Sequence, residues 1–457
     1  MKNETFEKQT FYKRRSSWND HPQKTVFSFA EEYKSFLRNA KTERESVKEI
    51  EAALKKKGFK DISKTESLKP KDKVYKIIRN RCILAAIIGK EPTFRIIGSH
   101  IDSPRLDLKP QPLYEDSSLA MLRSHYYGGI KKYNWLNIPL AMHAVIHTNK
   151  GKKEISIGEK DNEPKFIIPD LLPHLARDQM EKKMREAVKG EDLQIIVGNI
   201  PVDDENIKEK VKFQVLKLLN KRYDIIEKDF LSADISFVPA QNPVDIGFDE
   251  SMIAAYGHDD HACVYTSLHA LLETENPMHT ALCFFADKEE IGSYGDTGAQ
   301  SKALEYFMGD ILHLSGRKER MTQVLEESKA LSGDVTVAID PIFKDVHDPS
   351  NASYLGYGVS VEKYGGAGGK YSTNDASSEY MNWFVSILDK KDINWQTGEL
   401  GKIDVGGGGT IAMFMAKYGI EVIDVGPCVL GMHTTTEVLS KADVYSTYLA
   451  YKSFFEK

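Results

Sequence analysis

Five acidic or histidine residues stand close to apolar, strand-like runs of the sequence, and their types are those that bind metal ions. They are His100, Asp259, Glu290, Asp340 and His433. The runs 93–98, 281–286, 335–339 and 421–425 lead into four of them, whereas Asp259 precedes a predicted helix. In an open α/β sheet, ligands bind beyond the carboxyl ends of the strands. We therefore expect two imidazoles and three carboxylates at one edge of one sheet.

This set of side chains is suited to two divalent metal ions, most simply zinc. Two zinc ions about 3.5–4 Å apart can polarise a carbonyl group and hold a hydroxide at neutral pH. Such a pair needs one bridging carboxylate, for which we expect Asp259. His100 and Asp340 would complete one site, and Glu290 and His433 the other. Nitrogen and oxygen ligands without a thiolate favour a catalytic, exchangeable site, which could also accept cobalt or manganese.

The prediction depends on the whole set, because a single histidine or aspartate at a strand end is more often a surface or capping residue. Asp259 is the least determined member, since His258, Asp260 and His261 adjoin it. These four residues could also be interpreted as a metal cluster of their own. Consecutive residues at the start of a helix cannot all face one ion, so some of them are expected to be neighbours of the ligands.

Two further carboxylates adjoin predicted ligands and could take part in catalysis. Glu289 and Glu290 are adjacent on an irregular segment and point in different directions, so one can bind metal while the other acts as a base near the bridging water. Asp102 stands two residues after His100 and can accept a hydrogen bond that orients the imidazole. The fully apolar run before 287–290 argues against a loop that merely projects into solvent.

Two glycine-rich segments, 365–370 and 406–409, do not match nucleotide-binding loops. In the first, Tyr364 stands where a phosphate-binding loop has its first glycine, and Tyr371 stands where it has Ser or Thr. The second precedes a predicted helix and could present backbone N–H groups to an anion. Because no acidic residue stands in the context of a dinucleotide site, we interpret both segments as tight loops near a substrate.

The composition is that of an ordinary globular protein. Its 457 residues suggest two or three domains, and a net charge of −5 gives no indication of nucleic-acid binding. The first residues contain no apolar run that could act as a secretory signal, and no stretch approaches the ~20 apolar residues of a membrane span. The four cysteines form no CxxC pair, which favours reduced thiols and a cytoplasmic protein.

The positions of the predicted ligands indicate a discontinuous catalytic domain. His100 comes early, yet its partners begin only at Asp259. The intervening segment 110–240 has a different character, with alternating apolar stretches followed by charged, helix-prone sequence, and we interpret it as an inserted domain. Residues 1–109 and 241–457 would then form the catalytic domain, an α/β fold in which strands, loops and helices alternate from residue 244 onward.

At these residues the chain resembles the aspartyl aminopeptidase / aminopeptidase I family of dinuclear zinc exopeptidases. The likeness extends over nearly the whole chain, and the matching segments are 99–104 with 109–110, 257–260, 287–293 with 298–301, and 430–433 with Glu437. The resemblance implies that Glu289 is the general base, that Glu290 is a ligand and that Asp259 is the bridge. It also implies a zinc-exopeptidase α/β/α sandwich with an inserted β-rich dimerisation domain.

The resemblance further implies partners and substrates. Members of the family assemble as large tetrahedral homo-oligomers, commonly dodecamers. Segment 169–177 resembles one whose histidine, here His174, reaches the active site of a neighbouring subunit. Lys363 falls where some relatives hold a basic residue for acidic substrates. However, the glycine-rich segments resemble the bacterial branch, which leaves the preference for acidic N-terminal residues open.

We therefore predict a metalloaminopeptidase that removes N-terminal residues from peptides, with no nucleic-acid or membrane partner. Glu289 would take a proton from the attacking water and pass it to the leaving amine. One alternative is a metal-dependent phosphohydrolase that uses the cluster from His258 to His261. Another is a non-catalytic scaffold, against which the intact ligand set and Glu289 argue.

Overall fold

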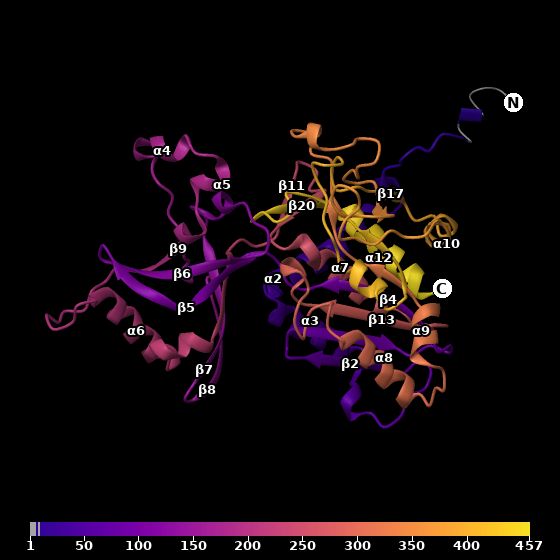
Figure 1. The fold of residues 1–457 in the computed structure, drawn as a ribbon, viewed down its shortest axis with the longest axis horizontal. Coiled ribbons are helices and arrows are strands. Elements are labelled where there is room, and N and C mark those ends of the chain that lie inside the picture. The colour runs from indigo at the N-terminus through magenta and orange to yellow at the C-terminus, as the bar shows by residue number, and fades with distance from the viewer. Residues whose placement is uncertain (1–5, 8–9) are drawn as a thin grey trace.

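The computed structural model describes residues 6–7 and 10–457, and a nine-stranded mixed sheet forms the centre of its larger lobe (Figure 1). In spatial order its strands are β1 (Lys60–Asp61), β2 (Lys73–Ile78), β3 (Cys82–Ile87), β13 (Thr280–Ala286), β4 (Phe94–His100), β14 (Lys329–Ser332), β18 (Glu421–Gly426), β16 (Val359–Glu362) and β17 (Trp395–Thr397). Strands β13, β4, β14 and β18 are parallel to one another. Their carboxyl ends therefore lie at the same edge of the sheet.

The central strands are apolar on both sides because helices cover both faces of the sheet. In β13, Cys283 and Phe285 belong to one buried cluster, while Leu282 and Phe284 belong to another, since successive side chains of a strand point to opposite faces. The first cluster packs against α2 (Gln23–Asn39), α3 (Glu43–Lys56), α7 (His258–Leu272), α10 (Ser378–Lys390) and α12 (Lys441–Phe455). The second packs against α8 (Ala303–Leu314), α9 (Met321–Glu327) and α11 (Ala412–Ala416). The predicted α/β fold is confirmed.

A six-stranded antiparallel sheet forms a second lobe beside the first (Figure 1). Its order is β8 (Gly151–Ile157), β7 (Leu140–Thr148), β10 (Asp234–Pro239), β5 (Arg105–Asp116), β6 (Leu119–Tyr127) and β9 (Gln194–Gly198). This lobe has its own apolar core around Trp135 and Phe237, and it carries α4 (Arg177–Met180), α5 (Met184–Ala187) and α6 (Lys210–Tyr223). The domain boundaries at 110 and 240 stay a prediction; the strands of this sheet extend from Arg105 to Pro239.

A five-stranded sheet contains the last group of strands. Its order is β11 (Val244–Ile246), β12 (Met252–Ala255), β20 (Glu437–Ser440), β19 (Cys428–Leu430) and β15 (Thr336–Val337). Strand β15 lies in the apolar run 335–339, which is therefore outside the central sheet. The short 3-10 helices are η1 (Ser17–Asn19), η2 (Ile62–Lys64), η3 (Lys132–Trp135), η4 (Pro173–Leu175), η5 (Gly190–Asp192), η6 (Glu227–Ser232), η7 (Glu289–Ile291) and η8 (Lys344–Val346). Among the described residues, no helix has both the length and the apolar character needed to cross a membrane.

Candidate metal centre

Three neighbouring strands of the central sheet deliver polar side chains to one edge. His100 is the last residue of β4, Glu290 follows β13 in η7, and Asp334 comes two residues after β14. In the sheet, β4 lies between β13 and β14. Asp259 reaches the same place from the start of α7, and His433 from the loop after β19. The main chain turns into α7 at Gly257. The φ angle of this residue is +79°, which would strain any residue that carries a side chain.

These side chains form two groups that share one carboxylate. The first group is His100, Asp259 and Asp334, and the second is Asp259, Glu290 and His433. Oδ1 of Asp259 lies 3.1 Å from Nε2 of His100, and its Oδ2 lies 3.2 Å from Nε2 of His433. The two oxygens of Asp259 thus face different imidazoles, as a carboxylate that bridges two metal ions must.

The remaining member of each group lies close to the histidine of that group. Nε2 of His433 is 3.3 Å from Oε2 of Glu290, and Nε2 of His100 is 3.9 Å from Oδ1 of Asp334. Both groups consist of imidazole nitrogens and carboxylate oxygens, a set that suits zinc in an exchangeable site. All the side chains concerned are largely buried, and His433, the most accessible, is about one third exposed.

The position of Asp334 corrects the expectation that Asp340 completes the first group. Strand β14 ends at Ser332 beside β4, so Asp334 lies at the carboxyl edge of the central sheet. Asp340 instead follows β15, which pairs with β19 in the five-stranded sheet. Its Oδ1 accepts the backbone N–H of Ile342 at 2.8 Å and stabilises a turn. Neither group found among the described residues contains Asp340.

The charges and the unpaired atoms of the centre fit divalent cations. Within the described part of the chain, the buried Oδ1 of Asp259 and Oε1 of Glu290 accept no hydrogen bond. Burial and the charge of Asp259 raise the pKa of Glu290 well above its usual range. Burial, with the charge of Asp260, does the same for the pKa of Asp334. Buried carboxylate oxygens without a hydrogen-bond donor are costly, and bound cations would offset this cost.

Glu437 holds both halves of the centre through backbone hydrogen bonds. Its Oε2 accepts the N–H of Asp259 at 3.0 Å, and its Oε1 accepts the N–H of His433 at 2.8 Å. The side chain is 1% exposed, and burial, together with the charge of Asp259, raises the pKa of Glu437 to about 8. The sequence alone did not identify this role, although a lone carboxylate in the otherwise apolar start of β20 was a usable signal.

Asp102 orients His100 and also fixes the segment that carries the two adjacent glutamates. Nδ1 of His100 lies 2.9 Å from the main-chain carbonyl oxygen of Asp102 and 3.4 Å from its Oδ1. The carboxylate of Asp102 accepts the backbone N–H groups of Glu289 and Glu290 at 3.1 and 3.2 Å. Asp260 contributes similarly, because its Oδ2 accepts the N–H of His100 at 3.2 Å.

Glu289 lies beside the centre but belongs to neither group of candidate ligands. Its carboxyl group is close enough to feel the charges of His100, Asp259 and His433, and burial raises its pKa to about 7. A carboxyl group with such a pKa can both accept and release a proton near neutral pH. Glu289 and Glu290 therefore differ in surroundings, as expected from the sequence.

His258 and His261 do not form a metal cluster with their neighbours. The two ring nitrogens of His258 lie 2.8 Å from the hydroxyl of Tyr33 and 3.1 Å from the carbonyl of Ile253. Those of His261 lie 2.9 Å from the hydroxyl of Ser46 and 2.8 Å from the carbonyl of Gly257. Because hydrogen bonds engage all four nitrogens, this arrangement gives no support to a phosphohydrolase site at these histidines.

The peptide bond between Asp259 and Asp260 is cis.

Besides Asp340, two other predicted site residues lie outside the centre in the single chain. His174 is exposed in η4, next to α4, which Figure 1 places in the antiparallel lobe on the side remote from the central sheet. Lys363 follows β16 directly; its Nζ is 3.6 Å from Oδ1 of Asp375, and its side chain is 43% exposed. Any contact of His174 with a metal centre would have to involve another copy of the chain.

Comparison with known proteins points to the same chemistry. Residues 36–455 match the family described as aminopeptidase I zinc metalloprotease, M18. The probable M18 family aminopeptidase 1 of Clostridium acetobutylicum is 47% identical over 447 residues, which cover 96% of this chain and 96% of that protein. The crystal structure of an M18 family aminopeptidase from Thermotoga maritima has a TM-score of 0.95 at 46% identity and covers 98% of this chain and 100% of that one.

A more distant structure shows the same fold. The mApe1 dodecamer from S. cerevisiae has a TM-score of 0.74 at 21% identity, covering 93% of this chain and 96% of that one.

Proposed function

Because the chain belongs to the M18 family of aminopeptidase I zinc metalloproteases, we propose that it removes N-terminal residues from peptides at a dinuclear metal centre. The observation that carries the proposal is the shared carboxylate of Asp259, whose two oxygens face two histidines from opposite groups. His100, Asp259 and Asp334 would hold one ion, and Asp259, Glu290 and His433 the other. Zinc is the expected ion, and cobalt or manganese would fit the same ligands.

When bound, such a pair of ions supplies Lewis acidity toward the scissile carbonyl group and makes a water molecule acidic enough to react near neutral pH. The protein contributes the position and movement of the proton. Glu289 is the proposed base, since it adjoins the ligand Glu290 yet stays outside both groups. Asp102 fixes the backbone of both residues, so that one carboxylate reaches the metal and the other stays free.

In the proposed reaction, Glu289 takes the proton of the attacking water and later gives it to the amine that leaves. Asp102 keeps the imidazole of His100 in a fixed orientation through the bond at Nδ1, so that Nε2 faces Asp259. Glu437 keeps the backbone of Asp259 and His433 in place. These contacts hold the reacting groups rigidly, which is a main source of catalytic rate.

The test separates the base from the ligand. Glu289→Gln should keep both metal ions and lose about 10²–10⁴ of the rate, as removal of a general base does, whereas Glu290→Gln should lose metal. Rates are measured with aminoacyl substrates, and metal content by elemental analysis. A chelator should abolish wild-type activity, and zinc should restore it. The roles are reversed if Glu289→Gln is the variant that loses metal.

We also propose that the chain forms a homo-oligomer, in the manner of a tetrahedral dodecamer, through the antiparallel lobe. Around His174, this lobe exposes large apolar side chains: Leu171 46%, Leu172 48%, Leu175 68%, Met180 70% and Met184 65%. Apolar clusters of this kind are typical of protein interfaces. The expected role of His174 is to reach the centre of a neighbouring copy and stabilise the oxyanion formed there. Light scattering that shows an active monomer would refute this assembly.

A further inference from the structure

Tyr127 links the antiparallel lobe to the metal centre. It is the last residue of β6, and its hydroxyl donates a hydrogen bond of 2.8 Å to Oδ2 of Asp102. The same oxygen accepts the N–H of Glu290, and Oδ1 accepts the N–H of Glu289. A side chain from one lobe therefore fixes the carboxylate that holds the catalytic segment of the other lobe.

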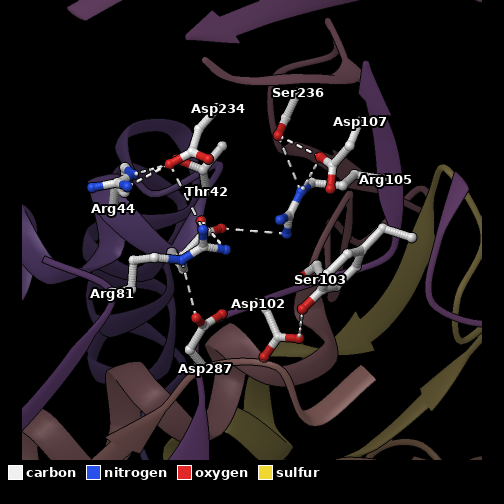
Figure 2. Close-up of polar contacts among 12 residues, drawn as sticks. Thr42, Arg44, Arg81, Asp102, Ser103, Arg105, Asp107, Asp234, Ser236 and Asp287 are labelled. Carbon is white, nitrogen blue, oxygen red and sulfur yellow. Dashed lines mark hydrogen bonds and ion pairs between the residues drawn. The ribbon is translucent and has the colours of Figure 1, made fainter. Parts of the chain in front are cut away.

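Arg105 holds the ring of Tyr127 in place. The two residues face each other across β5 and β6, and the guanidinium carbon of Arg105 lies 4.0 Å from the centre of the ring. Figure 2 shows that Arg105 is itself fixed by polar partners: its Nε lies 2.8 Å from Oδ1 of Asp107 and 3.1 Å from Oγ of Ser236. Arg105 is 3% exposed, so that this cation is anchored within the protein.

A second arm of the same network holds the catalytic segment from its other end. Asp287 precedes Glu289 by two residues, and its Oδ2 lies 3.1 Å from Nε of Arg81 (Figure 2). Nη2 of Arg81 is 3.0 Å from Oε1 of Glu43, while Oε2 of the same glutamate is 3.3 Å from Nη1 of Arg105. Glu43, on α3, thus connects the two arms.

We propose that Tyr127 is a positioning residue for the peptidase reaction and acts through Asp102. The inference depends on the proposed metal centre and adds a function for the antiparallel lobe within its own subunit. Without the hydroxyl, Asp102 keeps its two backbone donors but loses the contact that fixes its carboxylate from the side of the lobe. The same carboxylate lies 3.4 Å from Nδ1 of His100 and holds the backbone N–H of Glu289.

The test is Tyr127→Phe, with Tyr126→Phe as the matched control. Phenylalanine keeps the ring under Arg105 and removes only the hydroxyl. Tyr126 is the adjacent residue of the same strand, is 40% exposed, and has no part in the network. Loss of a residue that supports a metal ligand lowers metal affinity or activity by about 10–100-fold. We expect kcat of Tyr127→Phe to fall by about this factor with KM within about twofold, and zinc affinity, measured by chelator competition, to fall by about tenfold.

A double-mutant cycle shows whether the effect passes through Asp102. If it does, Tyr127→Phe should cost little in an Asp102→Asn background, because residues that act as one unit are not additive. The proposal is refuted if Tyr127→Phe matches Tyr126→Phe in both kcat and zinc affinity, or if its effect is undiminished beside Asp102→Asn. A wild-type enzyme that is insensitive to chelators would instead refute the metal centre itself.

Arg105→Lys offers a second route to the same ring. It keeps the positive charge near Glu43 but loses the planar contacts with Asp107 and Ser236. Like Tyr127→Phe, it should lower kcat, and this effect should also be smaller in the Asp102→Asn background. An unchanged kcat for Arg105→Lys would contradict the role assigned to the network.

Discussion

Replacing Glu437 with glutamine should weaken the metal centre without touching any proposed ligand. The carboxylate accepts one hydrogen bond at each oxygen, from the N–H groups of Asp259 and His433. A glutamine keeps one acceptor oxygen, but its amide group must turn two N–H bonds toward the other donor. In the zinc-loaded protein the nearby cations favour the charged form of Glu437. One hydrogen bond to a charged acceptor then becomes a neutral one, and one buried N–H loses its partner.

The magnitude follows from these two changes. A hydrogen bond to a charged group contributes about 1.5–3 kcal/mol and a neutral one about 0.5–1.5 kcal/mol, while a buried donor without a partner costs about 1–3 kcal/mol. We therefore expect zinc-loaded Glu437→Gln to be less stable by about 2–4 kcal/mol. Zinc affinity should fall by about 10–100-fold, the usual effect of removing a group that positions metal ligands.

Chelator competition measures the affinity, and denaturant unfolding of the zinc-loaded protein measures the stability. Glu421→Gln is the matched control, because Glu421 is a 41% exposed glutamate that pairs with Lys329 at the start of β18, away from the centre. The reasoning fails if Glu437→Gln binds zinc as tightly as the control, since Glu437 would then not hold the backbone of the ligands.

Three further predictions concern the lobe junction, the assembly and the substrate. Burial lowers the pKa of His143, but the carboxylates of Glu159 and Glu45 outweigh it and raise that pKa to about 9. The charged His143 should therefore add about 3 kcal/mol to the free energy of unfolding. This contribution should be complete below pH ~6.5 and should disappear as pH rises through ~9. Urea unfolding across this pH range should show that the free energy of unfolding falls with pH in wild type but not in His143→Gln. An equal fall with pH in both proteins would contradict the prediction. Mixed oligomers of inactive His174→Ala and Glu289→Gln should regain activity, because some sites would combine an intact Glu289 with a neighbour's His174; mixed oligomers that stay inactive would exclude a role across the interface. Lys363→Ala should lower kcat/KM for substrates with acidic N-terminal residues by about tenfold or more relative to neutral ones, and an equal effect on both would show that Lys363 does not select the substrate.

The sequence predicted most of the carboxyl edge of the central sheet because two of its strands give a clear pattern of apolar residues. Residues 93–98 and 281–286 are apolar runs buried on both sides, and the polar residues that follow them mark the carboxyl ends of β4 and β13. This pattern placed His100 and Glu290 at one edge of the sheet, where both lie in the structure, and their role as metal ligands stays a prediction. His433 was harder to place because a whole further strand, β19, separates it from the central β18.

Asp334 was missed because β14 contains only the four residues Lys329–Ser332 and gives a weak pattern. The stronger apolar run at 335–339 drew attention to Asp340, although its strand β15 belongs to another sheet. Local patterns reveal that a strand exists, but not which sheet it joins.

The contacts of Glu437 and Tyr127 could not be predicted from local sequence, although the isolated carboxylate of β20 marked Glu437 as a candidate. Glu437 binds the backbone of Asp259 across 178 positions of the chain, and Tyr127 meets Asp102 only because β5 and β6 bring Arg105 opposite Tyr127 at the junction of two lobes. Such roles depend on tertiary packing.

Anomalous diffraction at the zinc edge tests the dinuclear centre most directly. Crystals of the zinc-loaded protein should show two peaks about 3.5–4 Å apart, on either side of the Asp259 carboxylate. His100 and Asp334 should contact one peak, and Glu290 and His433 the other. A single peak, peaks away from Asp259, or a peak bound by Asp340 in place of Asp334 would contradict the proposed centre.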